Sequence, residues 1–197
     1  MCYNGINFFW RNSFVRIRPA AETDLNAVAQ SYRNQLMYEM ENNTSYSNWK
    51  FGVYPTTEVS IRAHAKQELY VAETKGRIIG SMILTEKQPK EYKDISWKTE
   101  NSGKILVVHT LCVPPRHSGK GCGHSMLRYV LELSSDQGYS AVRCNLWQDN
   151  QPAKHLLEDM GFYVCGSHAF LPDSLPEETD LFMEYDLTRK RSYEFDL

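Results

Sequence analysis

The chain has 197 residues, which suits one domain with a sizeable core, and its 22 Lys and Arg residues nearly balance 24 Asp and Glu residues. The net charge of −2 and the scatter of basic residues, apart from Arg189–Arg191, give no argument for a nucleic-acid partner or an acidic membrane surface. Five cysteines without a C-x-x-C pair indicate neither a disulfide framework nor a zinc site. No apolar run approaches the ~20 residues of a membrane span. We therefore expect a cytoplasmic protein with no metal, no nucleic-acid partner and no membrane association.

The first half of the chain is predicted to hold two helices and three strands. Thr23 is the predicted N-cap of a helix that continues through Leu36. Lys75-Gly76 is typical of a short hairpin turn between two strands. The polar and aromatic segment 42–54 predicts a loop or a broken helix. The expected order is strand 14–18, helix 23–36, helix 57–66, strand 68–74 and strand 77–84.

In the second half, strands and helices alternate, which favours a layered α/β fold. A long loop at 86–103 comes first. The expected elements are then strand 104–113, helix 123–137, strand 141–146, helix 151–160, and strands 163–165 and 180–187.

The most informative segment runs from Val113 to Gly123 and reads VPPRHSGKGCG. It lies between a predicted strand and a predicted helix. Glycines let a backbone approach a ligand closely, successive loop amides can form an anion-binding nest, and a helix N-terminus attracts phosphate. The segment has neither the Walker A pattern nor the GxGxxG spacing of dinucleotide-binding loops. A phosphorylated cofactor of another kind is therefore expected here.

The pattern Arg116-x-x-Gly119-x-Gly121, after a strand that ends Leu111-x-Val113-x-Pro115, resembles the coenzyme A loop of the GNAT superfamily of N-acetyltransferases. A second segment resembles another motif of that superfamily, Asn-x-x-Ala-x-x-x-Tyr followed by Gly-Phe. Asn150, Ala153, Gly161 and Phe162 match this motif, whereas the tyrosine position is Leu157.

The resemblance covers roughly residues 14–187 and implies one GNAT domain there, with terminal extensions at 1–13 and 188–197. The implied fold is a mixed central sheet flanked by helices, with a cofactor cleft between the two central strands. The implied cofactor is acetyl-CoA. The implied cofactor-binding residues are Leu111, Cys112, Val113, Arg116, His117, Ser118, Gly119, Lys120, Gly121, Cys122, Gly123, His124, Asn150 and Ala153.

The resemblance implies acetyl transfer to a primary amine of a small molecule or peptide by direct transfer in a ternary complex. The alternative is a non-catalytic acyl-CoA-binding module, because Leu157 stands where the family's tyrosine protonates the leaving thiolate. Another acyl donor, such as succinyl-CoA, also stays open, because the loop would bind phosphates and not the acyl group.

His109 is the catalytic candidate, because it shares one strand face with Leu111 and Val113 and a histidine collects protons near neutrality. The alternatives are a buried structural histidine and, as a weaker base, Glu73 on a neighbouring strand. His155 is two residues from position 157 and points elsewhere on the helix, so it does not replace the missing acid.

The acceptor pocket is expected in irregular segments, where binding residues often lie. The candidates are Trp49, Tyr54, Tyr92 and Trp97, with Trp49, Tyr54 and Trp97 as the chosen substrate-binding residues, since aromatic rings suit a cationic or apolar amine. Loop packing onto the core is the alternative for each of these aromatic residues. The nearby carboxylates of Glu39, Glu41 and Asp94 could pair with an ammonium, and the alternative for them is a solvated surface charge. The segment Phe8-Phe9-Trp10 could pack on the domain or on a second subunit of a homodimer.

Overall fold

The computed structural model describes residues 7–10, 13–100, 103–170 and 178–188, with side chains for all of these except 7–10, 13–14, 170 and 178. Arg189–Arg191 and Cys2 lie outside the described residues. The chain divides into two compact units, the first formed by residues 1–84 and 109–129 and the second by residues 85–108 and 130–197. The chain passes from unit to unit within strand β5 (Ile105–Cys112) and within helix α3 (Cys122–Asp136).

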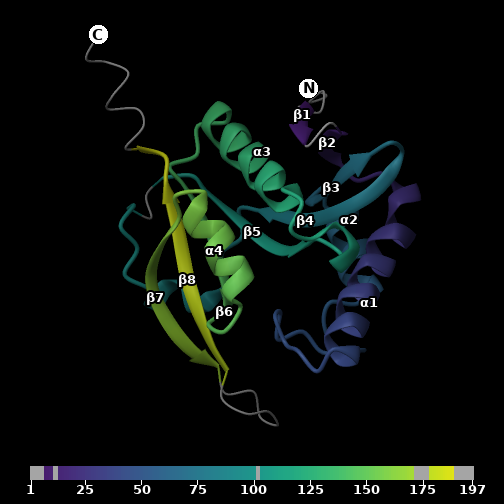
Figure 1. Ribbon diagram of the computed structural model, residues 1–197. Helices are drawn as coiled ribbons and strands as arrows, with labels where there is room; N and C mark the ends of the chain where they lie inside the picture. The colour runs from purple at the N-terminus through teal and green to yellow at the C-terminus, as the bar shows by residue number, and fades with distance from the viewer. Residues whose placement is uncertain (1–6, 11–12, 101–102, 171–177, 189–197) are drawn as a thin grey trace. The chain divides into compact units, whose positions relative to one another are not determined.

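The first unit is built on an antiparallel ladder in the order β1-β2-β3-β4 (Figure 1). Lys75 and Gly76 connect β3 to β4 with φ values of 47° and 71°. Two positive φ angles are what a two-residue hairpin turn requires, so the predicted turn is confirmed. Strand β1 was not predicted from the sequence. The bounds are β1 (Asn7–Trp10), β2 (Ser13–Pro19), α1 (Leu25–Glu41), α2 (Thr57–Ala65), β3 (Leu69–Thr74) and β4 (Arg77–Thr85).

The prediction that Thr23 caps the first helix is wrong. Residues Glu22–Asp24 form a 3-10 turn, and α1 begins at Leu25 with Asp24 as its N-cap residue. The Asp24 carboxylate accepts a hydrogen bond from the Ala21 amide at 2.8 Å and pairs with Arg18 at 2.6 Å. Because of these bonds, the helix begins at Leu25 and not at the predicted Thr23.

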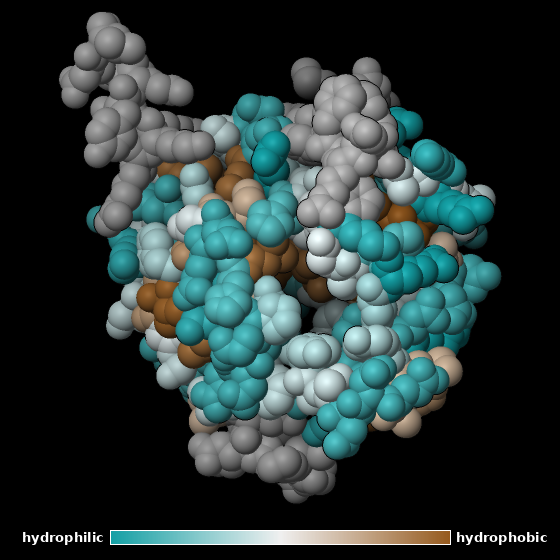
Figure 2. Space-filling model, viewed as in Figure 1, coloured by the Kyte–Doolittle hydropathy of each residue, from teal (hydrophilic) through white to brown (hydrophobic). Residues whose placement is uncertain are grey.

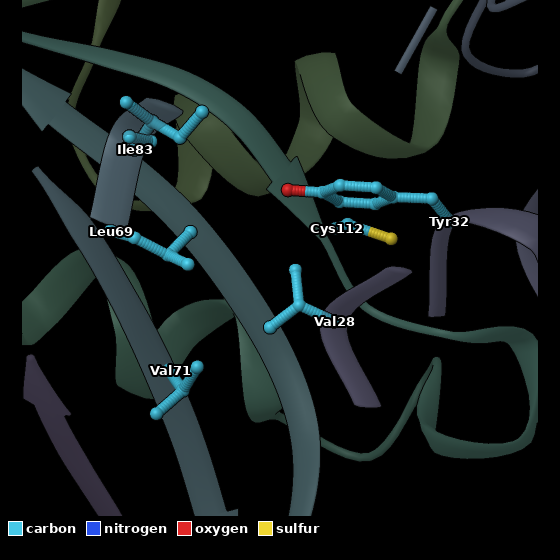
Figure 3. Packing of buried hydrophobic residues seen from close by; sticks show 7 residues of the cluster. Val28, Tyr32, Leu69, Val71, Ile83 and Cys112 are labelled. Carbon is cyan, nitrogen blue, oxygen red and sulfur yellow. The ribbon is translucent and has the colours of Figure 1, made fainter. Parts of the chain in front are cut away.

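Helices cover both faces of the ladder in the first unit. Leu69 and Val71 of β3 pack with Val28 and Tyr32 of α1 in one hydrophobic cluster, as Figure 3 shows. Tyr70 points to the opposite face, because side chains alternate along a strand, and its ring lies 5.9 Å from that of Tyr129 in α3. The part of α3 that belongs to the first unit, up to Tyr129, is thereby held on the face of the ladder opposite α1.

The second unit is a mixed sheet in the order β5-β6-β8-β7. β5 pairs in parallel with β6 from Ile105/Ala141 to Val107/Arg143, and the other two ladders are antiparallel. The predicted mixed α/β class is thus confirmed, while the predicted cleft between the central strands stays a prediction. The bounds are β6 (Ala141–Trp147), α4 (Gln151–Asp159), β7 (Tyr163–Phe170), which is longer than predicted, and β8 (Glu178–Asp186).

The two faces of the sheet in this unit pack against different layers. Ala141 and Phe182 belong to a cluster with Tyr92 and Ile95, which come from the segment 85–103. Tyr185 is three residues beyond Phe182 on β8 and therefore points to the opposite face, where its ring lies 5.5 Å from that of Phe162, just after α4. The outer face of α4 is hydrophilic (Figure 2).

A buried ion pair joins β6 to β8 at directly opposed positions. Arg143 and Glu184 are both fully buried, and the Arg143 Nε donates to the Glu184 carboxylate at 2.8 Å. The remaining Arg143 nitrogens donate to Gln88 Oε1 at 2.7 Å and to the Thr99 carbonyl at 2.9 Å. The guanidinium also lies 4.2 Å from the ring centroid of Trp97. The buried charge is therefore paired, hydrogen-bonded and stacked.

The Glu184 carboxylate binds the segment 85–103 through backbone amides. It accepts from the amides of Lys98 at 3.1 Å and Thr99 at 2.9 Å, and from the Tyr163 hydroxyl at 3.0 Å. Beyond the end of β4, the described residues of this segment form just one short 3-10 helix, Lys90–Asp94, and one carboxylate anchors the segment to the sheet.

We expect Glu184→Gln to lower the free energy of unfolding by about 3–5 kcal/mol, because it leaves the buried Arg143 charge without its counter-charge. Urea denaturation at pH 7 measures this loss. Glu158→Gln is the matched control, since Glu158 forms only an exposed pair with Lys154 at 3.9 Å, and it should change stability by less than about 0.5 kcal/mol. If both variants lower the free energy of unfolding by the same small amount, the buried pair does not stabilise the second unit.

Candidate functional site

The second half of β5 carries the candidate catalytic residue and leads into the glycine loop. From residue 109 onward burial alternates along the chain: His109 and Leu111 are half-buried, whereas Thr110 and Cys112 are buried. Val113 is half-buried too, so His109, Leu111 and Val113 are alike in their exposure, while their common strand face stays a prediction.

Thr110 departs from regular strand geometry. Its φ is +49°, which a β-branched residue rarely adopts, and strained backbone of this kind clusters at functional sites. Its hydroxyl is hydrogen-bonded to the Tyr54 hydroxyl. Sequence reasoning missed Thr110, because a threonine inside an apolar run is typical of an ordinary strand.

The environment of His109 favours its neutral form. Burial lowers the pKa of His109 below its ordinary value of 6.5, and the negative charge of Glu68 partly opposes this shift. A histidine with a lowered pKa is uncharged at neutral pH and can accept a proton. Glu68 was also missed, since nothing in the sequence places the residue before β3 beside β5.

Glu73, the weaker base candidate, has a different role in the structure. Its carboxylate accepts from Arg18 Nε at 2.8 Å, and the same guanidinium binds Asp24. Together they tie β2, β3 and the start of α1 to one another. The Glu73 carboxylate is thus part of a structural ion-pair network with Arg18 and Asp24.

The glycine loop begins with a 3-10 turn, Pro115–His117, and ends where α3 starts at Cys122. Gly119 and Gly121 have φ values of 67° and 84°, so both positions require the conformational freedom of glycine. A Cβ on Gly119 would meet nothing within 4 Å, so the backbone there is open to a ligand.

Positive charge gathers on this loop. Arg116 and Lys120 are exposed, and the Lys120 ammonium donates to the Arg116 carbonyl at 2.6 Å. Burial and then the charges of these two residues lower the pKa of His117. Ser118 and His124 are exposed as well. The loop therefore offers glycine amides and cationic side chains to an anion.

Two of the predicted cofactor-binding residues direct their side chains into the core. Cys112 and Cys122 are 2% and 1% exposed, and the Cys122 thiol donates to the Ile79 carbonyl at 3.7 Å. β4 and α3 pack closely at Gly80, because a Cβ on this residue would lie 2.8 Å from Met126 Sδ. Any ligand contact of the two cysteines must come from their backbone atoms.

The remaining predicted cofactor residues belong to the second unit. Asn150 is the N-cap of α4, and its side chain accepts from the Ala153 amide at 3.1 Å. Leu157 is buried, so the position of the family tyrosine is an apolar part of the helix packing. Asn150 and Ala153, which match the sequence motif, thus form the N-terminal cap of α4 in the structure.

The predicted acceptor-binding aromatics belong to two different units. Trp49 and Tyr54 lie in the first unit with their ring centroids 6.2 Å apart, and Trp49 also contacts Tyr32 edge-on. Trp97 lies in the second unit, where it donates to the Tyr92 carbonyl at 2.7 Å and stacks against Arg143. These contacts give Trp97 the packing role that the sequence left open as its alternative.

Residues 27–162 match the acetyltransferase (GNAT) family. The chain therefore belongs to this family and is an acyltransferase, and acetyl-CoA is its cofactor. Membership confirms the resemblance stated from the glycine loop and the Asn150 segment, and it decides against the non-catalytic module.

Curated relatives match over most of the chain. The L-amino acid N-acyltransferase MnaT of Escherichia coli K12 is 23% identical over 178 residues, 88% of this chain and 95% of that protein. Phosphinothricin N-acetyltransferase of Streptomyces viridochromogenes is 25% identical over 156 residues, 78% of this chain and 76% of that protein.

Solved structures show the same fold. A GNAT acetyltransferase of Streptococcus agalactiae has a TM-score of 0.73 at 16% identity and covers 91% of this chain and 98% of its own. The yncA protein of Salmonella typhimurium, solved with its cofactor acetyl-CoA, has a TM-score of 0.64 at 18% identity and covers 88% of this chain and 94% of its own.

Metal-binding side chains do not cluster in the part of the chain that the structure describes: His, Cys, Asp and Glu form no group of three or more there that could hold a metal ion. Among the described residues, no helix is long and apolar enough to cross a membrane.

We expect Tyr54→Phe to lower the free energy of unfolding by about 1–3 kcal/mol, because the buried Thr110 hydroxyl loses its partner. Urea denaturation of Tyr54→Phe, Thr110→Val and the double variant gives the coupling between the two side chains. Tyr46→Phe is the matched control, since Tyr46 is about as exposed as Tyr54 (36% and 39%) but does not bind Thr110, and it should be neutral. Additive losses in the double variant would mean that the hydroxyls do not interact.

Proposed function

We propose that this protein transfers an acetyl group from acetyl-CoA to a primary amine of a small molecule or peptide by direct transfer in a ternary complex. The observation that carries the proposal is His109, a half-buried histidine with a lowered pKa on the strand that leads directly into the glycine loop. The N-acyltransferase and N-acetyltransferase names of the two curated relatives agree with an amine acceptor.

The residues of the loop fit a phosphorylated cofactor. Two glycines with positive φ and an unobstructed surface can present backbone amides to a diphosphate, and Arg116 and Lys120 supply opposite charge. We therefore assign phosphate binding to the segment Arg116–Gly123 with His124 beside it. Leu111 and Val113 would offer backbone amides to the rest of the cofactor.

Acetyl-CoA, when bound, supplies an activated acyl group as a thioester. The chain has to remove a proton from the acceptor ammonium, whose ordinary pKa is near ~10. His109 is uncharged at neutral pH, so its imidazole can take that proton, and Glu68 then stabilises the imidazolium. Holding both substrates in position would supply much of the remaining rate.

No side-chain acid is assigned to the leaving thiol. Leu157 is apolar and buried, and His155 is exposed on another side of α4. We infer that the thiolate departs into solvent or takes its proton from water. This departure from the family motif affects the rate of one step and leaves proton removal by His109 intact.

The cytoplasmic location and the domain bounds stay proposals. The free thiols of Cys112, Cys122, Cys144 and Cys165 agree with a reducing compartment such as the cytoplasm. The domain bounds of 14–187 likewise extend the matched residues 27–162 on both sides.

We expect Gly121→Glu to abolish measurable coenzyme A binding, because both the bulk and the negative charge of the new side chain oppose a diphosphate. Isothermal titration calorimetry with coenzyme A measures the affinity. Gly76→Glu is the matched control, since Gly76 has a similar φ of 71° but lies in the β3–β4 turn. Unchanged affinity in folded Gly121→Glu would contradict the assignment of the loop.

We expect His109→Gln to reduce kcat by ~10²- to 10⁴-fold while coenzyme A binding stays nearly intact. In the wild type, kcat should rise with pH through an ionisation below 6.5 and then level off, because the neutral imidazole is the active form. His109→Gln should flatten this rise.

Glu68→Gln provides the companion variant. Removing the negative charge lowers the pKa of His109 further, so the rise in kcat should move to lower pH. A profile that is unchanged in both variants, normalised to the folded fraction, would remove His109 from the mechanism and leave the cofactor loop standing.

A further inference from the structure

The first unit contains a cavity of about 190 Å³ between the end of α1 and the following loop. Pockets for a whole drug-sized ligand have volumes of about 300–1,000 Å³. One side of the cavity is apolar and accessible, since Met40 and Phe51 are 69% and 58% exposed. The cavity is therefore of a size for one end of a ligand.

A buried carboxylate lies in the wall of this cavity. Glu39 is 5% exposed and accepts hydrogen bonds from Gln35 Nε2 at 2.7 Å and from the Ser47 hydroxyl at 2.9 Å. Both donors are neutral. Within the described residues, no lysine, arginine or histidine forms an ion pair with Glu39. Burying a carboxylate without a counter-charge is unfavourable, so this site favours a cationic ligand.

Two further groups in the same wall suit an ammonium. The Thr44 hydroxyl is buried and has no hydrogen-bond partner among the described residues, so a polar group that enters the cavity could satisfy it. Trp49 lines the cavity with an aromatic ring, and such rings attract cations. A carboxylate, an unpaired hydroxyl and an indole thus meet at one small cavity.

The carboxylate in the cavity is not the one that acts on His109. Trp49 contacts Tyr54 edge-on, and Tyr54 in turn reaches Thr110, the residue after His109. The negative charge of Glu39 helps to raise the pKa of the buried Cys112 thiol at the end of β5, whereas the charge that acts on the pKa of His109 is that of Glu68. A cation held at Glu39 is for this reason a different group from the amine that is acetylated.

We propose that the Glu39 cavity binds a second cationic group of the acceptor, so that the substrates are diamines, polyamines or basic peptides rather than simple monoamines. This inference rests on the proposed amine acetylation. The Glu39 carboxylate and the Thr44 hydroxyl would hold the remote ammonium, while the methylene chain of the acceptor would pass along the aromatic wall to β5.

Three acceptors of equal chain length test the proposal with acetyl-CoA: 1,6-diaminohexane, hexylamine and 6-aminohexanoate. They share one primary amine and differ only in the remote ammonium, methyl or carboxylate. We expect KM for the diamine to be ~10- to 100-fold below that for hexylamine, because a charge-assisted hydrogen bond is gained, and 6-aminohexanoate to be the poorest.

The variant Glu39→Gln tests whether the preference for the diamine depends on the carboxylate in the cavity. It should raise KM for the diamine by at least ~10-fold and leave KM for hexylamine within about two-fold. Glu41→Gln is the matched control: it removes the same charge from an exposed residue of the same helix and should change neither. Thr44→Val should raise KM for the diamine alone by a smaller factor.

A binding measurement distinguishes failure of this inference from failure of the proposed function. Without acetyl-CoA, the diamine but not hexylamine should raise the Tm of the wild type, and Glu39→Gln should lose that shift. If no amine is acetylated, the Tm shift still supports the cavity. Equal KM values for diamine and hexylamine, or equal losses for both in Glu39→Gln, overturn it. If Glu39→Gln does not fold, Thr44→Val and the three wild-type acceptors decide.

Discussion

The hydrogen bond between the Tyr54 and Thr110 hydroxyls connects the loop after α1 to the strand that carries His109. Thr110 has a positive φ, so β5 cannot hold this conformation through strand pairing alone, and a partner side chain helps to fix it. The same tyrosine contacts Trp49, which lines the Glu39 cavity. The backbone that presents His109 and the wall that would receive the acceptor therefore depend on one contact.

The two units treat a buried carboxylate in opposite ways. Glu184 is neutralised by Arg143 and receives three further hydrogen bonds, so its charge is fully satisfied within the chain. Among the described residues, Glu39 receives hydrogen bonds from neutral donors alone, and a hydroxyl without a partner there lies in the same wall. Complete satisfaction is typical of a structural element, whereas an incomplete set of partners is typical of a place where a ligand supplies the remainder.

Periodicity and turn chemistry were enough to predict most elements of the fold. The Lys75-Gly76 turn, the strands beside it and the alternation of the second half follow from local patterns that the structure keeps. The glycine loop was visible for the same reason, since glycines at 119 and 121 are required by the backbone itself.

What sequence could not supply was the pairing of residues far apart in the chain. Glu68 affects His109, and Tyr54 reaches Thr110, through contacts that no local spacing encodes. Trp97 looked like a binding aromatic, because its loop is irregular, yet its ring stacks on a guanidinium that arrives from β6. The helix start at Leu25 was displaced for a similar reason, as Arg18 holds the carboxylate of Asp24.

The attachment of the segment 85–103 to Glu184 has a consequence for how this part of the chain can vary. Loops usually tolerate insertions and are cut readily by proteases, since few backbone groups are fixed. Here the amides of Lys98 and Thr99 bond to a carboxylate in the interior, so their hydrogens exchange with solvent only when the second unit opens. These two amides are thus as protected as those of a strand, although they lie outside any helix or strand, and a change in chain length beside them would disturb the interior.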